Sequence, residues 1–326
     1  MAGTPAAQAP APRALMRVVY FGTSAYAVPV LERLAHSDHR VVACVSRPDR
    51  PQGRGLKPAP SPVKAAAERL GLIVQQPERP RADAIAPLEA DVGVVVAYGQ
   101  LLRRDLLEAV RFGLLGVHPS LLPKYRGAAP VPWAILNGEP ETGVCIYRLV
   151  EALDAGPVLI RRIMPIAPEE TSEGLSARLS TLGAEALIEA LHQLSAGTAK
   201  ETPQRDEEAT FAPKLTKAQG TLDWRLPARE LERQVRAFVP WPVATAWRGG
   251  EPLRIFAASA CPDARSGAAP GTVVRASSDG IAVATGQGEL QVLEVQPGGR
   301  RRMPAAAFVA GRGIAAGDRF ETPPAS

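Results

Sequence analysis

Arg17-Val-Val-Tyr-Phe-Gly22 is a short apolar run that ends in glycine, and Thr23-Ser24 follows it directly. Behind this stretch, Val28, Leu31 and Leu34 recur at the three-residue spacing of one helix face. We therefore predict a strand, a tight turn and a helix with a polar N-cap.

The same alternation of buried strand and helix continues to about residue 117. We predict strands over Val41–Ser46, Asp91–Ala97 and Leu114–Val117, and helices from Ser61-Pro62 to Leu70 and over Leu101–Val110. Continuous β-branched strands that alternate with helices are typical of parallel sheets covered on both faces. The N-terminal part is therefore predicted to be an α/β domain with a doubly wound, mostly parallel, Rossmann-like sheet.

The composition turns polar over Thr198–Ala212, as in a linker. Beyond it we predict one helix, Ala228–Phe238, and five short strands: Ala244–Trp247, Leu253–Ala257, Gly271–Val274, Ile281–Ala284 and Leu290–Val295. Such strands indicate a small OB-like β-barrel, a fold that suits a nucleic-acid partner. The expected domains are a flexible extension (1–15, with Met16 an alternative start), a catalytic domain (16–197), a linker (198–212) and a barrel domain (213–326).

The composition of the 326 residues, 46% hydrophobic and 22% charged, is that of a soluble globular protein. No membrane span or signal peptide is recognisable, and the three cysteines are widely spaced, so we expect a cytoplasmic protein without disulfides. The net charge of +5 lies entirely after residue 212, where 15 basic residues face 10 acidic ones. This basic part indicates either a polyanionic partner or only a contribution to solubility.

His118 directly follows the predicted strand Leu114–Val117 and thus lies where open parallel sheets bind their ligands. Asp154 occupies a second turn, Ala152–Pro157, between predicted strands. A carboxylate beside an imidazole fixes its tautomer and orientation, so the two residues are candidates for general acid/base catalysis. The remaining histidines, His36, His39 and His192, are expected on the surface without a companion group, and no metal site is predicted.

Several motifs resemble those of one enzyme family. His118-Pro-Ser-Leu-Leu-Pro123, Tyr125-Arg-Gly127 and Leu153-Asp-Ala-Gly-Pro157 are similar to the signature of formyltransferases that use 10-formyltetrahydrofolate. Within that group, the chain resembles the methionyl-tRNA formyltransferase family through Phe21-Gly-Thr23, Pro48–Gly55, Pro60–Lys64, Ala97-Tyr-Gly99, Asn137-Gly138, Glu141-Thr-Gly143 and Arg236–Pro242. The motifs occur in the family's order along both predicted domains.

The resemblance implies transfer of a formyl group from 10-formyltetrahydrofolate to the α-amine of initiator methionyl-tRNA, without a metal. It implies that His118 and Asp154 are catalytic and that Ser120, Leu121, Leu122, Pro123, Tyr98 and Gly99 contact the folate. The basic stretch Arg47–Lys64 is similar to the family's loop that enters the tRNA acceptor stem. The resemblance therefore implies that tRNA is contacted by Arg54, Arg50 and Lys57, and by Lys214 and Lys217 in the barrel domain. We expect the protein to be a monomer.

Position 116 departs from the family pattern, which has asparagine two residues before the histidine. Here Gly116 replaces it, and the only asparagine of the chain is Asn137 in another motif. Loss of one oxyanion donor typically costs about 10²–10³ in rate. Gly116 leaves room for a water or for Gln100 to take over; alternatively, the chain has reduced or lost catalysis and only binds tRNA.

Two further alternatives are other enzymes. A formyltransferase for a sugar-nucleotide amine would share the folate and Asp154 loops but would not need the basic stretch. A hydrolase built on Ser120, His118 and Asp154 lacks the nucleophile-elbow motif. Formyl transfer to methionyl-tRNA distinguishes these alternatives.

Overall fold

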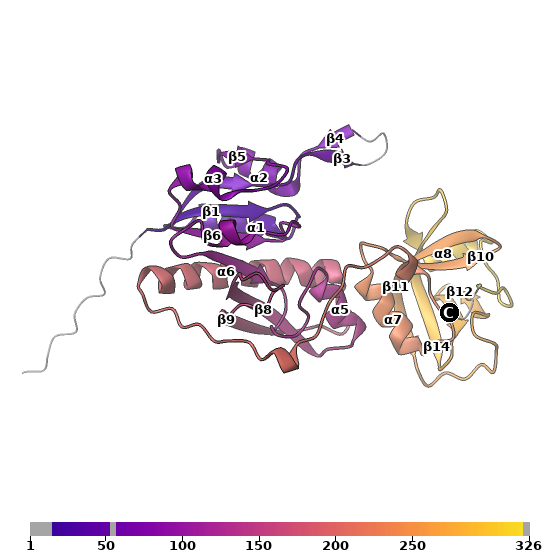
Figure 1. Ribbon diagram of the computed structural model, residues 1–326. Helices are drawn as coiled ribbons and strands as arrows, with labels where there is room; N and C mark the ends of the chain where they lie inside the picture. Colours follow the sequence, from indigo (N-terminus) through magenta and orange to yellow (C-terminus); the bar gives the residue numbers. More distant parts are fainter. Residues whose placement is uncertain (1–14, 53–56, 322–326) are drawn as a thin grey trace, which may run out of the picture. The chain divides into compact units, whose positions relative to one another are not determined.

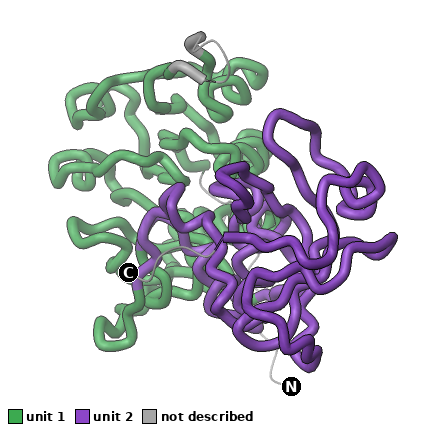
Figure 2. Tube along the Cα trace, turned by 90° about the vertical axis from the view of Figure 1, so that its right-hand side faces the viewer, with its two compact units in different colours: residues 1–126, 143–163, 177–210 green, residues 127–142, 164–176, 211–326 purple. Residues whose placement is uncertain are grey.

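The structure of the chain, a computed structural model, describes residues 15–52 and 57–321 (Figure 1). The chain folds into two compact units (Figure 2). Unit 1 contains the residues up to 126 together with 143–163 and 177–210, and unit 2 contains 127–142, 164–176 and the residues from 211 onward.

A seven-stranded sheet has the strand order β5-β2-β1-β6-β7-β8-β9. The strands are β1 (Arg17–Gly22), β2 (Arg40–Val45), β5 (Val74–Gln75), β6 (Val92–Val96), β7 (Leu114–His118), β8 (Glu141–Arg148) and β9 (Val158–Pro165). β1 pairs in parallel with β2 and β6, and β5 and β7 extend the parallel part, whereas β8 runs antiparallel to β7. The prediction of a mostly parallel, Rossmann-like sheet is confirmed.

Helices are interspersed with these strands along the chain, and the first, second and fourth lie within segments predicted to be helical (Figure 1). They are α1 (Ala27–Ala35), α2 (Pro62–Arg69), α3 (Ala82–Ile85), α4 (Arg104–Leu107), α5 (Pro130–Leu136) and α6 (Ser172–Ser195). Ser61 caps α2 as predicted, because its hydroxyl accepts a hydrogen bond from the Lys64 N–H at 3.0 Å. This cap satisfies one of the free donors at the helix start.

Two local predictions in this part are wrong. The N-cap of α1 is Tyr26, with no side-chain cap; the Thr23 hydroxyl instead donates to the backbone oxygen of Tyr98 at 2.8 Å. The helix expected over Leu101–Val110 is the single turn α4. Its apolar residues Leu102, Leu106 and Val110 are nevertheless buried in one cluster, because the chain buries them without forming a longer helix.

The basic stretch between β2 and α2 contains a short β-ribbon in place of a simple loop. Strands β3 (Arg50–Gln52) and β4 (Lys57–Ala59) pair antiparallel and stand out from the sheet (Figure 1). Arg54 lies outside the described residues. At the base of the ribbon, the Lys64 ammonium donates to the Asp49 carboxylate at 2.7 Å, so one cation of this stretch is neutralised.

Unit 2 contains the antiparallel sheet that the sequence predicts near its C-terminal end. Its strand order is β10-β11-β14-β13-β12, with β15 on β14. The strands are β10 (Ala244–Arg248), β11 (Glu251–Cys261), β12 (Val273–Ser277), β13 (Gly280–Ala284), β14 (Glu289–Pro297) and β15 (Met303–Pro304), accompanied by helices α7 (Ala228–Ala237) and α8 (Ala305–Ala310).

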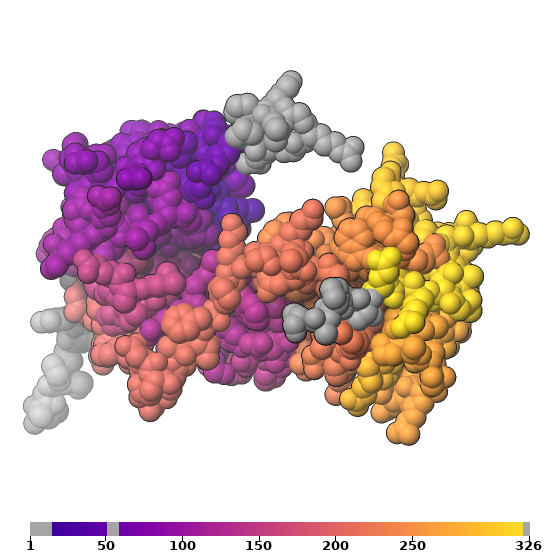
Figure 3. Space-filling model, turned by 45° about the vertical axis from the view of Figure 1, so that its right-hand side comes forward, coloured from indigo at the N-terminus to yellow at the C-terminus, as the bar shows by residue number. Residues whose placement is uncertain are grey.

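The chain segment 318–321 connects the two edges of this sheet. The Glu321 N–H donates to the backbone oxygen of Trp247 in β10, and the Phe320 N–H donates to that of Gly271, just before β12. This segment thus contacts both edges of the antiparallel sheet, and the predicted C-terminal β domain is confirmed. Buried side chains of α7 and α8 fill its core together with those of the strands. The orange and yellow atoms in Figure 3 are the surface of this part of unit 2.

Candidate active site

The last residue of β7 is His118, at the carboxyl end of the parallel part of the sheet. Val117 faces α6, because a Cβ placed on Gly183 of that helix would lie 2.8 Å from Cγ1 of Val117. Successive side chains of a strand alternate between the two faces, so His118 faces away from α6, on the same side as Gly116. The His118 side chain is nearly buried, with 8% of its surface exposed.

His118 and Asp154 lie next to each other, as the sequence predicts. The distance from Nδ1 of His118 to Oδ2 of Asp154 is 3.8 Å, and 12% of the Asp154 side chain is exposed. On the other side of the ring, Nε2 of His118 is 2.9 Å from the backbone oxygen of Tyr125. A carbonyl oxygen only accepts, so Nε2 carries the hydrogen. Nδ1 is therefore the nitrogen available for proton exchange, and it faces the carboxylate.

The turn that presents Asp154 has a special backbone. Asp154 has a φ of 49°, in the left-handed region that aspartate tolerates better than most residues. Gly156 is necessary two residues later, because a side chain there would overlap the backbone oxygen of Arg148. The motif glycine thus permits close packing of this turn on β8.

Gln204 holds the same turn from the segment expected to be a linker. Its Nε2 donates to the backbone oxygens of Asp154 and Gly156, each at 2.7 Å. Its Oε1 accepts from the buried guanidinium of Arg126, which also forms an ion pair with Asp206 at 2.7 Å. This part of the polar segment is therefore bound to unit 1, and Gln204 is a supporting residue that its linker-like composition concealed.

Tyr147 is a second residue that the sequence analysis missed. Its hydroxyl donates to Oδ1 of Asp154 at 2.6 Å, and its ring lies edge-on to that of His118, with centroids 6.2 Å apart. Burial, together with the nearby Asp154 carboxylate that accepts its hydrogen bond, raises the pKa of Tyr147 well above its usual value. The phenol therefore keeps its proton and acts as a donor throughout the physiological range.

The space beside Gly116 is filled, so the expectation of room for a water or for Gln100 is wrong. Gly116 is paired across the strands with Tyr147. A Cβ placed on Gly116 would lie 2.6 Å from Cζ of Tyr147, closer still to Cε1, and 2.9 Å from Cδ1 of Leu149. The aromatic ring therefore occupies the volume that any side chain at position 116 requires.

The residues expected to contact folate differ in their accessibility. The side chains of Ser120, Leu122, Pro123 and Tyr98 are buried, Leu121 is half-buried and Gly99 is exposed. The Ser120 hydroxyl donates to the backbone oxygen of Lys124 at 2.6 Å, which stabilises the loop after His118. Tyr98 packs edge-on against Phe21 in the core, and burial raises its pKa to about 12. Only the backbone of Tyr98 is thus at the sheet edge.

The cations expected to contact tRNA are distributed over both units. In unit 1, Arg50 is exposed and Lys57 pairs with Gln52 through the backbone of the ribbon. In unit 2, Lys214 and Lys217 are exposed, and no ion pair involves either of them within the described part of the chain. By contrast, Arg236, Arg248 and Arg302 form ion pairs with Glu232, Asp318 and Glu294, respectively.

The other histidines are not all isolated, which corrects the expectation for His39 and His192. His39 is buried, its ring centroid is 4.9 Å from that of His192, and its Nδ1 accepts from the Met16 N–H. His36 is exposed and contacts only the backbone oxygen of Glu32. Within residues 15–52 and 57–321, no group of three or more potential metal ligands is present.

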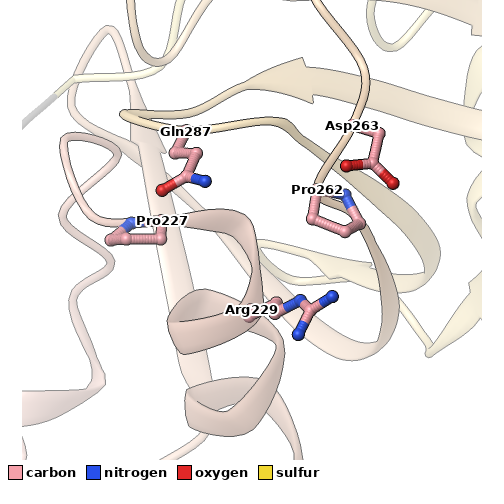
Figure 4. A pocket seen from close by; sticks show the side chains of 5 residues that line it. All are labelled: Pro227, Arg229, Pro262, Asp263 and Gln287. Atoms are coloured by element: carbon pink, nitrogen blue, oxygen red, sulfur yellow. The ribbon is translucent and has the colours of Figure 1, made fainter.

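A surface hollow of about 210 Å³ lies in unit 2 at the start of α7 (Figure 4). It is lined by Pro227, Arg229, Pro262, Asp263 and Gln287. None of the predicted site residues is among them. Over the described ranges, no helix combines the length and the apolar character that are needed to cross a bilayer.

Comparison with known proteins agrees with this architecture. The model of the family "Formyl transferase" matches residues 16–191, and that of "Formyl transferase, C-terminal domain" matches residues 214–313. The fold and these matches define a formyl transferase with an α/β part and a C-terminal β part.

Relatives identify the family more narrowly. The methionyl-tRNA formyltransferase of Roseiflexus castenholzii is 46% identical over 94% of this chain and 99% of its own length. That of Solibacter usitatus is 44% identical over 94% and 98%. The chain belongs to the methionyl-tRNA formyltransferase family, as its motifs predict.

One solved structure shares the fold at low sequence identity. It is HypX from Aquifex aeolicus in complex with tetrahydrofolic acid, with a TM-score of 0.61 and 19% identity. The match covers 92% of this chain and 47% of that one, so this chain spans about half the length of HypX.

Proposed function

We propose that this chain transfers the formyl group of 10-formyltetrahydrofolate to the α-amine of initiator methionyl-tRNA and thereby supports translation initiation. The observation that carries the proposal is the His118–Asp154 pair, 3.8 Å apart at the carboxyl end of β7. It occurs in a chain whose relatives at 44–46% identity are named methionyl-tRNA formyltransferases.

The reaction requires one bond to form, one to break and one proton to move. The amine nitrogen bonds to the formyl carbon, the bond from that carbon to the donor's nitrogen breaks, and the proton passes from the amine to the leaving nitrogen. His118 exchanges this proton through Nδ1, because Nε2 is held by the backbone oxygen of Tyr125. Asp154 orients the ring and stabilises its charged form. In that form, His118 also stabilises the oxygen that gains negative charge.

Residues at the sheet edge are compatible with a polar donor molecule. Gly99 is exposed, and the guanidinium of Arg47 is its neighbour. Nε of Arg47 is buried and has no hydrogen-bond partner in the described part of the chain. Leu121 and the backbone of the loop Ser120–Pro123 would complete the contact surface. The donor, when bound, supplies the formyl group.

The cations predicted from the sequence are assigned to tRNA phosphates. Arg50 and Lys57 would act from the ribbon, together with Arg54, which lies outside the described residues, and Lys214 and Lys217 from the barrel domain, which we assign to residues 213–326. Phosphate contacts position a nucleic acid and make its binding sensitive to salt. We place this monomeric enzyme in the cytoplasm, where initiator tRNA is used.

A formyl-transfer assay with purified protein tests the proposal. The ¹⁴C-formyl donor is offered with initiator methionyl-tRNA, with elongator methionyl-tRNA, or with a sugar-nucleotide amine. We expect label only in the initiator tRNA. Label in the sugar nucleotide would replace the proposed acceptor, and tRNA binding without any transfer would show that catalysis has been lost.

A further inference from the structure

The Tyr147 ring lies against Gly116, and the reaction described above does not explain this contact. The two residues face each other across β7 and β8, on the sheet face that also presents His118. Building on the proposed function, we propose that Tyr147 is a positioning residue: its ring replaces the side chain missing at Gly116, and its hydroxyl orients the Asp154 carboxylate toward His118.

The ring of Tyr147 sterically excludes a side chain at position 116. The ring lies over Gly116, and a Cβ there would be 2.6 Å from Cζ, which is far below ordinary contact distance. Behind the ring, Leu122, Cys145 and Val158 are buried against it in one cluster. The ring is therefore enclosed and cannot retreat from a larger residue at position 116. An aromatic residue at 147 and a side chain at 116 exclude each other.

The two oxygens of the Asp154 carboxylate face different groups. Oδ1 accepts from the Tyr147 hydroxyl at 2.6 Å, and Oδ2 faces Nδ1 of His118 at 3.8 Å. The hydrogen bond to Oδ1 restricts the rotation of the carboxylate and leaves Oδ2 facing Nδ1, with which it forms an ion pair when the imidazole is protonated. The raised pKa of Tyr147 keeps the phenol a donor, and hydrogen bonds to a charged group are the stronger ones.

The glycine at position 116 therefore leaves the space that the Tyr147 ring needs, and the Tyr147 hydroxyl on the neighbouring strand β8 is the hydrogen-bond donor that this ring brings to the site. The phenol reaches the catalytic pair through Asp154, whereas an amide at 116 would be adjacent to His118 on its own strand. Introducing asparagine at 116 alone therefore displaces Tyr147 and disturbs Asp154. We do not expect it to increase turnover.

A double-mutant cycle of melting temperatures tests the steric part without any activity measurement. The variants are Gly116→Ala, Tyr147→Leu and the double variant, since leucine lacks the two ring atoms that overlap a Cβ at 116. We expect Gly116→Ala to lower Tm by about 4 °C or more alone, and by much less in the Tyr147→Leu background. Gly174→Ala in α6, where the nearest atom to a Cβ is 3.7 Å away, is the control and should not lower Tm. Equal losses in both backgrounds would refute the steric coupling.

Tyr147→Phe tests the hydroxyl, because it keeps the ring and hence the fold. Carboxyl ¹³C NMR at neutral pH, with Asp154 assigned through Asp154→Asn, should show a changed carboxyl chemical shift in Tyr147→Phe, since Oδ1 loses its hydrogen bond from the phenol. In the transfer assay, kcat should fall about tenfold while KM for tRNA is unchanged. The control Tyr20→Phe removes a buried hydroxyl that donates to the backbone oxygen of Ala27, and it should change neither quantity.

The results distinguish a failure of this inference from a failure of the proposed function. If the wild-type protein transfers no formyl group to tRNA, the proposed function fails, while the Tm cycle and the carboxyl chemical shift of Asp154 still decide the role of Tyr147. If the wild-type protein is active but Tyr147→Phe has the wild-type carboxyl chemical shift and kcat, the inference about the hydroxyl is wrong and the proposed function stands.

Discussion

The carboxyl edge of the seven-stranded sheet and the cation-bearing surface of unit 2 differ in how their functional side chains are held. At the sheet edge, His118 and Asp154 are nearly buried, and each contacts a further group: the backbone oxygen of Tyr125 and the Tyr147 hydroxyl. In unit 2, Lys214 and Lys217 are exposed and take part in no ion pair within the described residues.

Because of this difference, we expect substitutions at the sheet edge to alter kcat and substitutions of the exposed lysines in unit 2 to alter KM for tRNA. A buried, hydrogen-bonded pair has a fixed geometry and acts on the bonds that change, so its loss lowers kcat. Exposed lysines each add a small, salt-dependent attraction for phosphates, so their loss raises KM. The first three predictions below test this separation and the fourth concerns stability; they run from the largest effect to the smallest.

The largest effect is expected for His118→Ala. Removing the group that moves the proton should lower kcat by about 10³, within the usual range for general acid–base catalysis. KM for tRNA should change less than threefold. Steady-state kinetics with varied tRNA concentration measure both, and His36→Ala, an exposed histidine, is the matched control. A large rise in KM with an unchanged kcat would place His118 in binding instead.

Gln204→Ala should have an intermediate effect. It removes both donors from the turn of Asp154 and leaves the buried Arg126 with fewer acceptors. We expect unfolding to become easier by about 1–3 kcal/mol and kcat to fall about tenfold. Urea unfolding and the transfer assay measure these quantities. Gln219→Ala is the control, since the Gln219 amide oxygen also accepts two hydrogen bonds, but in the short 3₁₀ helix Ala218–Gly220 of unit 2. An unchanged kcat in Gln204→Ala would separate this residue from the site.

Lys214 and Lys217 test the binding side of the comparison. In the variant with both lysines changed to alanine, KM for tRNA should rise several-fold at low salt, and the slope of log KM against log salt should decrease by about two. The value of kcat should stay as it is. Arg225→Ala provides the control, because that guanidinium already forms an ion pair with Asp223. An unchanged slope would exclude these two lysines as phosphate contacts.

The smallest effect concerns stability at mildly acidic pH. Burial, and the neighbouring His192, lower the pKa of His39 below 6.5, whereas Asp38 has a weaker opposite effect. Below about pH 6.5 the unfolded chain therefore binds a proton at this position that the folded chain resists, so stability falls as the pH falls. Between pH 7 and 5, His39→Asn should lose less stability than the wild-type protein, since asparagine can still accept from the Met16 N–H. Equal losses would exclude His39 as a source of this dependence.

The sequence was sufficient for the fold class and for the proximity of His118 and Asp154, but not for the contacts that support them. His118 and Asp154 could be paired because both belong to motifs of one family and both were expected in turns at strand ends. The carboxyl ends of β7 and β8 themselves lie at opposite edges, because the two strands are antiparallel, and the turn that carries Asp154 brings it to His118. Tyr147 could not be found, since its role depends on the register that places it opposite Gly116. Gln204 lies in a polar segment whose composition is that of a linker. His39 and His192 are 153 residues apart in the chain, and no local pattern reports their contact.

The central claim is that the His118–Asp154 pair of this chain carries formyl transfer to initiator methionyl-tRNA. Single-turnover transfer at saturating tRNA, comparing the wild-type protein with Asp154→Asn, tests it most directly, because asparagine keeps the shape of the side chain and removes the charge. We predict transfer by the wild-type protein and a rate at least about 10²-fold lower in the variant. Equal rates in the two proteins, or no transfer by either, would contradict the account.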